Sequence, residues 1–97
     1  MIYVIARAKL KEGMLEKYIE ICKANIPNVL AEEGCIMYQL ATDCGGTETD
    51  PDCATFVEWW ESQAHLDAHL ATPHMARFRE QVTPLRISTK LQILKSV

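Results

Sequence analysis

The chain has 97 residues, of which 48% are hydrophobic and 24% are charged, and its net charge is −3. These values are typical of one small globular domain, which we expect to span residues 1–97. The negative charge argues against a nucleic acid partner, because nucleic-acid-binding domains carry a basic surface. No apolar run approaches the roughly 20 residues that a membrane span needs, and no signal-peptide layout opens the chain. We therefore expect a cytoplasmic protein.

The first half of the chain predicts a strand followed by a helix. Residues 2–10 are rich in β-branched and aromatic side chains, as strands are. From Met14 to Glu33, apolar residues recur every three or four positions, which is the spacing of one helical face. Pro27 should kink or divide this helix, and Gly34 stands where a helix stop belongs.

Two further strands are predicted over residues 35–43 and 54–61, joined by the polar loop 44–53. Cys44 and Cys53 flank this loop and could meet across it. In a reducing cytoplasm, however, free thiols are the better interpretation.

The last third of the chain predicts two short helices and a final strand. Ser62 is placed to cap the first of these helices, and Thr72 followed by Pro73 should begin the second. Pro84 should end that helix, and residues 87–94 read as a strand.

The predicted order β-α-β-β-α-β is that of an α+β, ferredoxin-like fold with an antiparallel sheet and both helices on one face. The strands, however, carry apolar side chains on both faces. In the first strand Tyr3 and Ile5 oppose Val4, and in the second Cys35 and Met37 oppose Tyr38. Since the helices can cover one face only, we expect the other face to pack in a symmetric homodimer.

The three histidines of the chain lie in one short stretch, at His65, His69 and His74. His65 and His69 are four residues apart and could bind one metal ion, but a third ligand is needed. His74 lies beyond the break between the two helices, so we expect no metal site. Leu66 and His69 share the face that must cover the sheet, which favours a half-buried His69 that handles a proton. The competing interpretation is a core histidine without a chemical role.

Glu58 lies on the third strand, on the same face as Trp60. A carboxylate among aromatic side chains is costly to bury unpaired, so it needs a partner, and His69 or Arg7 could be one. The alternatives are an edge strand with Glu58 in water, or a salt bridge across a dimer interface. Tyr38 should bring a hydroxyl to the same apolar surface.

Three motifs together resemble one known family. They are EEGCIMY at residues 32–38, E-x-W-E-S at 58–62 and AHLDAHLATPHM at 64–75. In this order they are similar to the antibiotic biosynthesis monooxygenase family, and above all to its small bacterial quinol monooxygenases. The resemblance extends over nearly the whole chain.

The resemblance implies a dimeric α/β barrel with a pocket between sheet and helices. It implies a quinol-like aromatic substrate, molecular oxygen as co-substrate, and no metal or flavin cofactor. The enzyme would take a proton from the bound phenol and shield the reacting pair from water. The site residues it implies are His69 and Glu58 for catalysis, and Tyr38, Trp60, His74, Met75, Phe78 and Arg7 for the substrate.

Other reactions remain open within this resemblance. Related domains isomerise a small phosphorylated sugar, and others degrade haem with a histidine as iron ligand. A dimer that binds small molecules without converting them is a further alternative.

Overall fold

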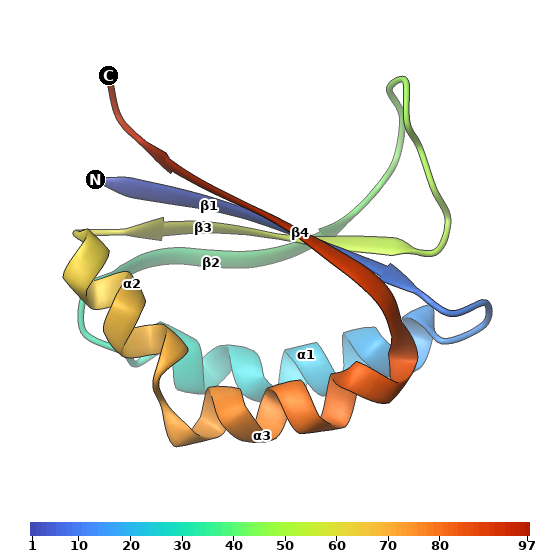
Figure 1. Ribbon diagram of the computed structural model, residues 1–97, viewed down its shortest axis with the longest axis horizontal. Coiled ribbons are helices and arrows are strands. Elements are labelled where there is room, and N and C mark those ends of the chain that lie inside the picture. The colour runs from blue at the N-terminus through green and yellow to red at the C-terminus, as the bar shows by residue number, and fades with distance from the viewer.

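The structure is a computed structural model that describes residues 1–97. It consists of a four-stranded antiparallel sheet, with the helices packed on one face (Figure 1). In chain order the elements are β1 (Ile2–Leu10), α1 (Leu15–Leu30), β2 (Cys35–Thr42), β3 (Cys53–Trp60), α2 (Gln63–Leu70), α3 (Pro73–Val82), a 3-10 turn (Thr83–Leu85) and β4 (Arg86–Lys95). The strand order is β2-β3-β1-β4. The predicted ferredoxin-like fold is therefore confirmed.

The predicted N-caps of α2 and α3 are both confirmed. The Ser62 side chain accepts a hydrogen bond from the backbone of His65, and the Thr72 side chain accepts one from Met75. Pro27, by contrast, does not divide α1, which runs on to Leu30. The proline lies in the last turns of the helix, where its ring removes a single N–H from the ladder.

A β-bulge at the start of β2 changes the predicted facing of its residues. Cys35 pairs with Trp60 and Met37 with Trp59, so Ile36 is the extra residue between two neighbouring pairs. Cys35 therefore lies on the helix-covered face with Tyr38 and packs against the core. The simple alternation that placed Cys35 with Met37 is wrong, because it assumes an unbroken register.

The second face of the sheet, here called the outer face, has no helix over it (Figure 1). Tyr3 and Trp59 pack there edge to face, with ring centroids 5.7 Å apart, and Leu94 pairs with Tyr3 from β4. Trp59 remains 40% exposed and Leu94 46% exposed. None of the helices combines the length and the apolar composition needed to cross a membrane.

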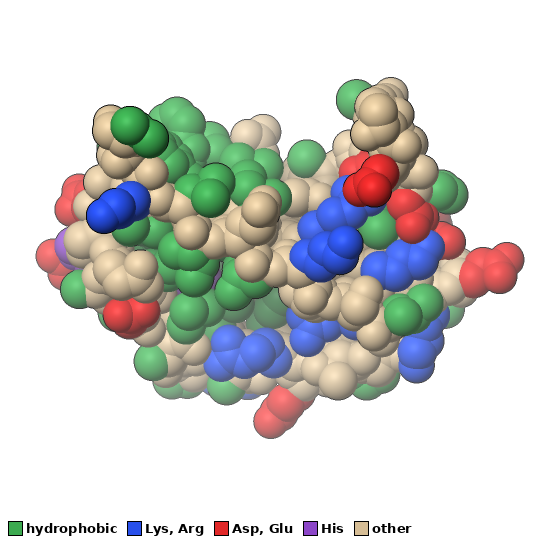
Figure 2. All heavy atoms as spheres, turned by 45° about the horizontal axis from the view of Figure 1, so that its top comes forward, with side chains coloured by type: hydrophobic (Ala, Val, Ile, Leu, Met, Phe, Trp, Pro, Cys, Tyr) green, Lys and Arg blue, Asp and Glu red, His purple; other side chains and the backbone are tan.

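The hairpin between β2 and β3 rises from the outer face as an arm (Figure 1). Two ion pairs tie it to β1: Arg7 to Asp43 at 2.6 Å and Lys9 to Asp50 at 2.7 Å. Figure 2 shows basic side chains gathered beneath this acidic arm, and hydrophobic side chains gathered toward the end of the sheet where the chain termini lie.

Candidate functional site

A cavity of about 200 Å³ lies between the sheet and the helices. Its wall is formed by 17 residues, of which 12 are hydrophobic. They come from all four strands and all three helices: Val4, Ala6, Ala8, Tyr18, Tyr38, Phe56, Glu58, Leu66, His69, Leu70, Met75, Phe78, Arg79, Arg86, Thr89, Leu91 and Ile93. The cavity is somewhat smaller than the roughly 300–1,000 Å³ usual for drug-sized ligands, so it suits a small and mainly apolar molecule.

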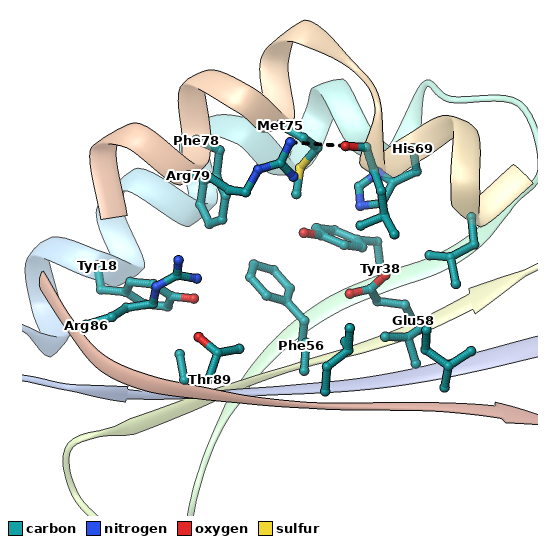
Figure 3. A pocket seen from close by; sticks show the side chains of 17 residues that line it. Tyr18, Tyr38, Phe56, Glu58, His69, Met75, Phe78, Arg79, Arg86 and Thr89 are labelled. Atoms are coloured by element: carbon teal, nitrogen blue, oxygen red, sulfur yellow. Dashed lines mark hydrogen bonds between the residues drawn. The ribbon is translucent and has the colours of Figure 1, made fainter. Parts of the chain in front are cut away.

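The cavity opens between β4 and the corner that joins α2 to α3. The lining residues on this side are exposed, namely Leu70 and Arg79 on the helices and Leu91 and Ile93 on β4. The Arg79 guanidinium donates a hydrogen bond of 3.1 Å to the backbone carbonyl of Leu70, which fixes it across this corner (Figure 3). A ligand can therefore enter past the uncovered side of the edge strand.

His69 is the most deeply buried polar residue of the cavity wall, with an exposed fraction of 1%. It lies on the inner side of α2, one turn after Leu66, because that side of the helix packs on the sheet. Its ring lies over Trp60 with a centroid distance of 4.6 Å, and the Tyr38 ring is 5.7 Å away. These contacts hold the imidazole in one orientation.

The Nδ1 atom of His69 lies 2.8 Å from the Glu32 carboxylate. A carboxylate can only accept, so we assign the proton to Nδ1, which leaves the Nε2 lone pair free. Burial lowers the pKa of His69, and the Glu32 contact opposes this shift without cancelling it. The imidazole is therefore neutral near pH 7 and has an unpartnered acceptor nitrogen.

Glu58 is 5% exposed on β3, which lies between β2 and β1 and is thus not an edge strand. Its partner is Trp60, whose indole N–H donates to Glu58 Oε1 at 3.0 Å. The expected pairing with His69 or Arg7 is wrong. Burial raises the pKa of Glu58 to about 7, an effect that the Trp60 hydrogen bond partly opposes and the Glu32 charge reinforces.

Five of the eight residues expected at the site do line this cavity. They are Tyr38, Glu58, His69, Met75 and Phe78. Tyr38 stacks on Phe56 with ring centroids 4.6 Å apart, and its hydroxyl makes no hydrogen bond within the chain. Burial raises the pKa of Tyr38, so this hydroxyl stays protonated and can donate to a ligand.

The other three expected residues lie elsewhere. Trp60 is fully buried behind His69 and supports the site without lining the cavity. His74 packs on the far side of Glu32, with Nε2 3.2 Å from its carboxylate. Arg7 points to the outer face and binds Asp43, because alternate residues of a strand face opposite sides of a sheet.

Several residues of the site were missing from the sequence-based set. Glu32 belongs to the EEG motif, and it lies beyond the end of α1 at Leu30, although the apolar spacing predicted a helix as far as Glu33. Tyr18 faces inward from α1 at the predicted apolar spacing. Arg86 opens β4, and its polarity gave no reason to place it in a cavity.

The three histidines do not share one site, because His69 and His74 both approach the Glu32 carboxylate while His65 lies apart from them. The His65 Nδ1 lies 2.8 Å from the Ser62 hydroxyl, whereas His69 faces Glu32 and the cavity. No group of three or more His, Cys, Asp or Glu side chains is arranged to hold a metal ion. All four cysteines are free thiols.

Residues 1–81 match the family described as antibiotic biosynthesis monooxygenase. The chain belongs to this family. It is 35% identical to the probable quinol monooxygenase YgiN of Escherichia coli K12 over 105 aligned residues, which cover 98% of this chain and 97% of that protein.

Solved structures agree with this family assignment. A conserved protein from Methanosarcina mazei Go1 superimposes with a TM-score of 0.90 at 25% identity, covering 99% of this chain and 92% of that one. Protein SO0527 from Shewanella oneidensis superimposes with a TM-score of 0.84 at 31% identity, covering 96% of this chain and 87% of that one. The family and the fold that the three sequence motifs indicated are thus confirmed.

Proposed function

We propose that this member of the antibiotic biosynthesis monooxygenase family oxidises a quinol or a related phenol with molecular oxygen, without a metal or flavin. The observation that carries this proposal is the contact of His69 Nδ1 with the Glu32 carboxylate, which leaves Nε2 without a partner beside a mainly apolar cavity. Family membership and the similarity to a protein named as a probable quinol monooxygenase support it.

In the proposed reaction the substrate hydroxyl gives its proton to His69 Nε2. The imidazolium that forms is stabilised by the Glu32 carboxylate on its other nitrogen, as a buried carboxylate does for a histidine base. At this end of the cavity, the Tyr38 hydroxyl and the protonated form of Glu58 can donate hydrogen bonds to the substrate oxygens. The phenolate is much richer in electrons than the phenol and can pass an electron to oxygen.

The reaction balances without an external reductant. A quinol with a free ring position reacts with one O₂: one oxygen atom forms a bond to the ring carbon, and the other leaves as water with two hydrogens. The product is the corresponding hydroxyquinone, so the substrate supplies all the electrons. The apolar walls serve to keep bulk water from the radical pair or peroxide formed on the way.

Oxygen consumption with menadiol, a small naphthalene quinol, tests this proposal. Wild type should consume oxygen well above the buffer rate, and ¹⁸O₂ should place one labelled atom in the hydroxyquinone product. His69→Gln should lower kcat about 10²- to 10⁴-fold, which is the usual contribution of a general base. His65→Gln is the matched control, because His65 faces Ser62 and not the cavity. An unlabelled quinone with hydrogen peroxide, or no rate above buffer, would refute the monooxygenase.

We further propose that residues 1–97 act as one domain within a homodimer formed through the outer face. Exposed large side chains such as Trp59 and Leu94 lie on this helix-free face, and contiguous apolar surface of this kind is typical of an interface. Trp59→Glu should convert the dimer to a monomer in light scattering, whereas Arg77→Glu on the exposed surface of α3 should leave it dimeric. A monomeric wild type at micromolar concentration would contradict the proposal.

A further inference from the structure

The cavity has polar groups at two separate ends. Figure 3 shows Glu58, Tyr38 and His69 at one end, and Arg86, Tyr18 and Thr89 at the other, with Phe56 between them. The proposed proton transfer uses the first end only. The second end has no role in that chemistry, and it carries a positive charge.

Arg86 is a half-buried cation without a partner in this chain. It is the first residue of β4, directly after the turn that follows α3, and it pairs with Leu10 of β1. No hydrogen bond or ion pair engages its guanidinium, whereas Arg79 binds the Leu70 carbonyl and Arg7 binds Asp43. The only acidic residue in the cavity wall is Glu58, at the opposite end.

The surroundings of Arg86 suit an oxygen anion. Its guanidinium lies beside the Tyr18 ring in Figure 3, and its charge opposes the effect by which burial raises the pKa of Tyr18. The Thr89 hydroxyl, which makes no hydrogen bond within the chain, lies on the same side of the cavity. A half-buried guanidinium holds a carboxylate through two parallel hydrogen bonds, which are stronger than those between neutral groups.

The two ends are too far apart for a single aromatic ring to touch both. Glu58 pairs with Val4 of β1 and Arg86 with Leu10, so their pairing positions lie six steps apart along β1. At about 3.3 Å per residue their backbones are about 20 Å apart, and the two side chains shorten this span from either side. A molecule of two or more fused rings, with its reactive hydroxyl and its acidic group at opposite ends, fits this arrangement.

We propose that Arg86 binds a carboxylate, or an equivalent anionic oxygen, on the substrate ring farthest from the reactive hydroxyl. The substrate class is then an acidic, fused-ring hydroquinone rather than a neutral quinol with a hydrocarbon tail. This inference rests on the proposed function for the orientation of the hydroxyl, but the anion site itself can be tested by binding alone.

The test compares two probes under nitrogen, 5,8-dihydroxy-2-naphthoate and its methyl ester, which lacks the negative charge and carries one added methyl group. Quenching of tryptophan fluorescence gives a Kd for each. Wild type should bind the carboxylate at least about ten-fold more tightly than the ester, as expected for a hydrogen bond to a charged group. In Arg86→Gln this preference should vanish, and in Arg86→Lys it should fall several-fold, because lysine lacks the planar fork.

Arg77→Gln is the matched control, since Arg77 lies on α3 outside the cavity wall and should keep the full preference. If Arg86→Gln does not fold, the Arg86→Lys measurement decides in its place. Equal affinity for acid and ester in wild type, or a preference that survives in Arg86→Gln or is unchanged in Arg86→Lys, would overturn the inference.

The oxygen assay separates the two proposals. If 1,4-dihydroxynaphthalene is oxidised and no acid preference is found, the proposed function stands and the anion site fails. If no quinol is oxidised but the acid binds selectively through Arg86, the anion site stands and the monooxygenase fails.

Discussion

The Glu32 carboxylate lies 2.8 Å from His69 Nδ1, although the two residues are 37 positions apart in the chain. The same oxygen is 3.2 Å from His74 Nε2, but neither ring nitrogen of His74 forms a hydrogen bond of good geometry. The Glu32 carboxylate therefore forms its hydrogen bond with His69 and not with His74. It makes Glu32 a positioning residue for the proposed base, because it fixes both the ring and its tautomer.

Replacing Glu32 by Gln should lower kcat/KM about ten- to a hundred-fold, a part of the usual contribution of a general base. The charge and hydrogen bond of Glu32 raise the pKa of His69 against the effect of burial. Without them this pKa falls further, so the acid limb of the kcat/KM profile should move to lower pH. Glu32→Asp should recover part of the rate.

The exposed neighbour Glu33 supplies the control, and Glu33→Gln should leave rate and profile unchanged. A loss of rate in Glu32→Gln without any shift of the acid limb would mean that Glu32 only supports the fold.

The raised pKa of Glu58 predicts a stability that falls as pH rises. The folded state holds this proton up to a pKa of about 7, whereas the ordinary value is 4.5. Between these values the folded state binds more protons than the unfolded chain, so the free energy of unfolding decreases through this window. The difference corresponds to about 3 kcal/mol at 1.36 kcal/mol per pKa unit.

Glu58→Gln removes this pH dependence. Relative to wild type, the variant should gain up to about 3 kcal/mol between about pH 4 and pH 8, measured by urea unfolding. Glu80→Gln, on the exposed side of α3, should follow the wild-type curve. Parallel curves for wild type and Glu58→Gln would show that Glu58 ionises without cost in the folded protein.

Trp60 controls the same titration through its hydrogen bond to Glu58. This bond lowers the pKa of Glu58 against burial, so Trp60→Phe should move that pKa above the wild-type value of about 7. A carboxyl band followed by infrared spectroscopy against pH measures the shift directly. Trp59→Phe, on the outer face, is the matched control and should leave the band unchanged. An unaltered titration in Trp60→Phe would mean that the indole donor does not influence Glu58.

The sequence predicted the secondary-structure elements and the inward orientation of His69, because both depend on short-range spacing. The inward side of α2 follows from the helical repeat that joins Leu66 to His69, and the caps follow from Ser62 and Thr72. The contact between Glu32 and His69 joins a turn to a helix across the fold, and no spacing rule reaches that far.

The errors at Cys35 and Arg7 have different causes. One inserted residue at Ile36 shifts the pairing of β2, and a bulge leaves no clear mark in the sequence. Arg7 was placed in the pocket as a partner for Glu58 and by resemblance, although strand alternation places it with Tyr3 and Ile5 on the other face.

The Arg7–Asp43 pair should hold the hairpin arm in its folded position without affecting the rate of oxidation. Asp43 also accepts a hydrogen bond from the backbone of Asp50, so it ties β1 and both sides of the hairpin together. Asp43→Asn should raise amide hydrogen exchange over residues 44–50 while the rate of menadiol oxidation stays within two-fold of wild type, a margin of about 0.4 kcal/mol. Asp67→Asn, on α2, is the control for exchange in the arm. A large loss of oxidation rate in Asp43→Asn would instead show that the Arg7–Asp43 pair contributes to the reaction.

Gly34 links the start of β2 to the helix that carries His69. Its φ of +81° is one that other residues rarely adopt, and a Cβ at this position would overlap the ring and Cβ of His65. Its carbonyl also accepts a hydrogen bond of 2.9 Å from the backbone of Glu61. An alanine at this position would therefore both strain the backbone and displace α2.

Gly34→Ala should therefore destabilise the protein by more than the about 1–2 kcal/mol expected for a left-handed alanine. It should also lower the oxidation rate, because His69 follows His65 on the same helix. Gly13→Ala separates the two effects, since Gly13 has a φ of +80° and nothing within 4 Å of an added Cβ. Gly13→Ala should lower the free energy of unfolding through backbone strain alone and leave the oxidation rate unchanged. Equal unfolding free energies for the two variants would show that His65 gives way to the added methyl group freely.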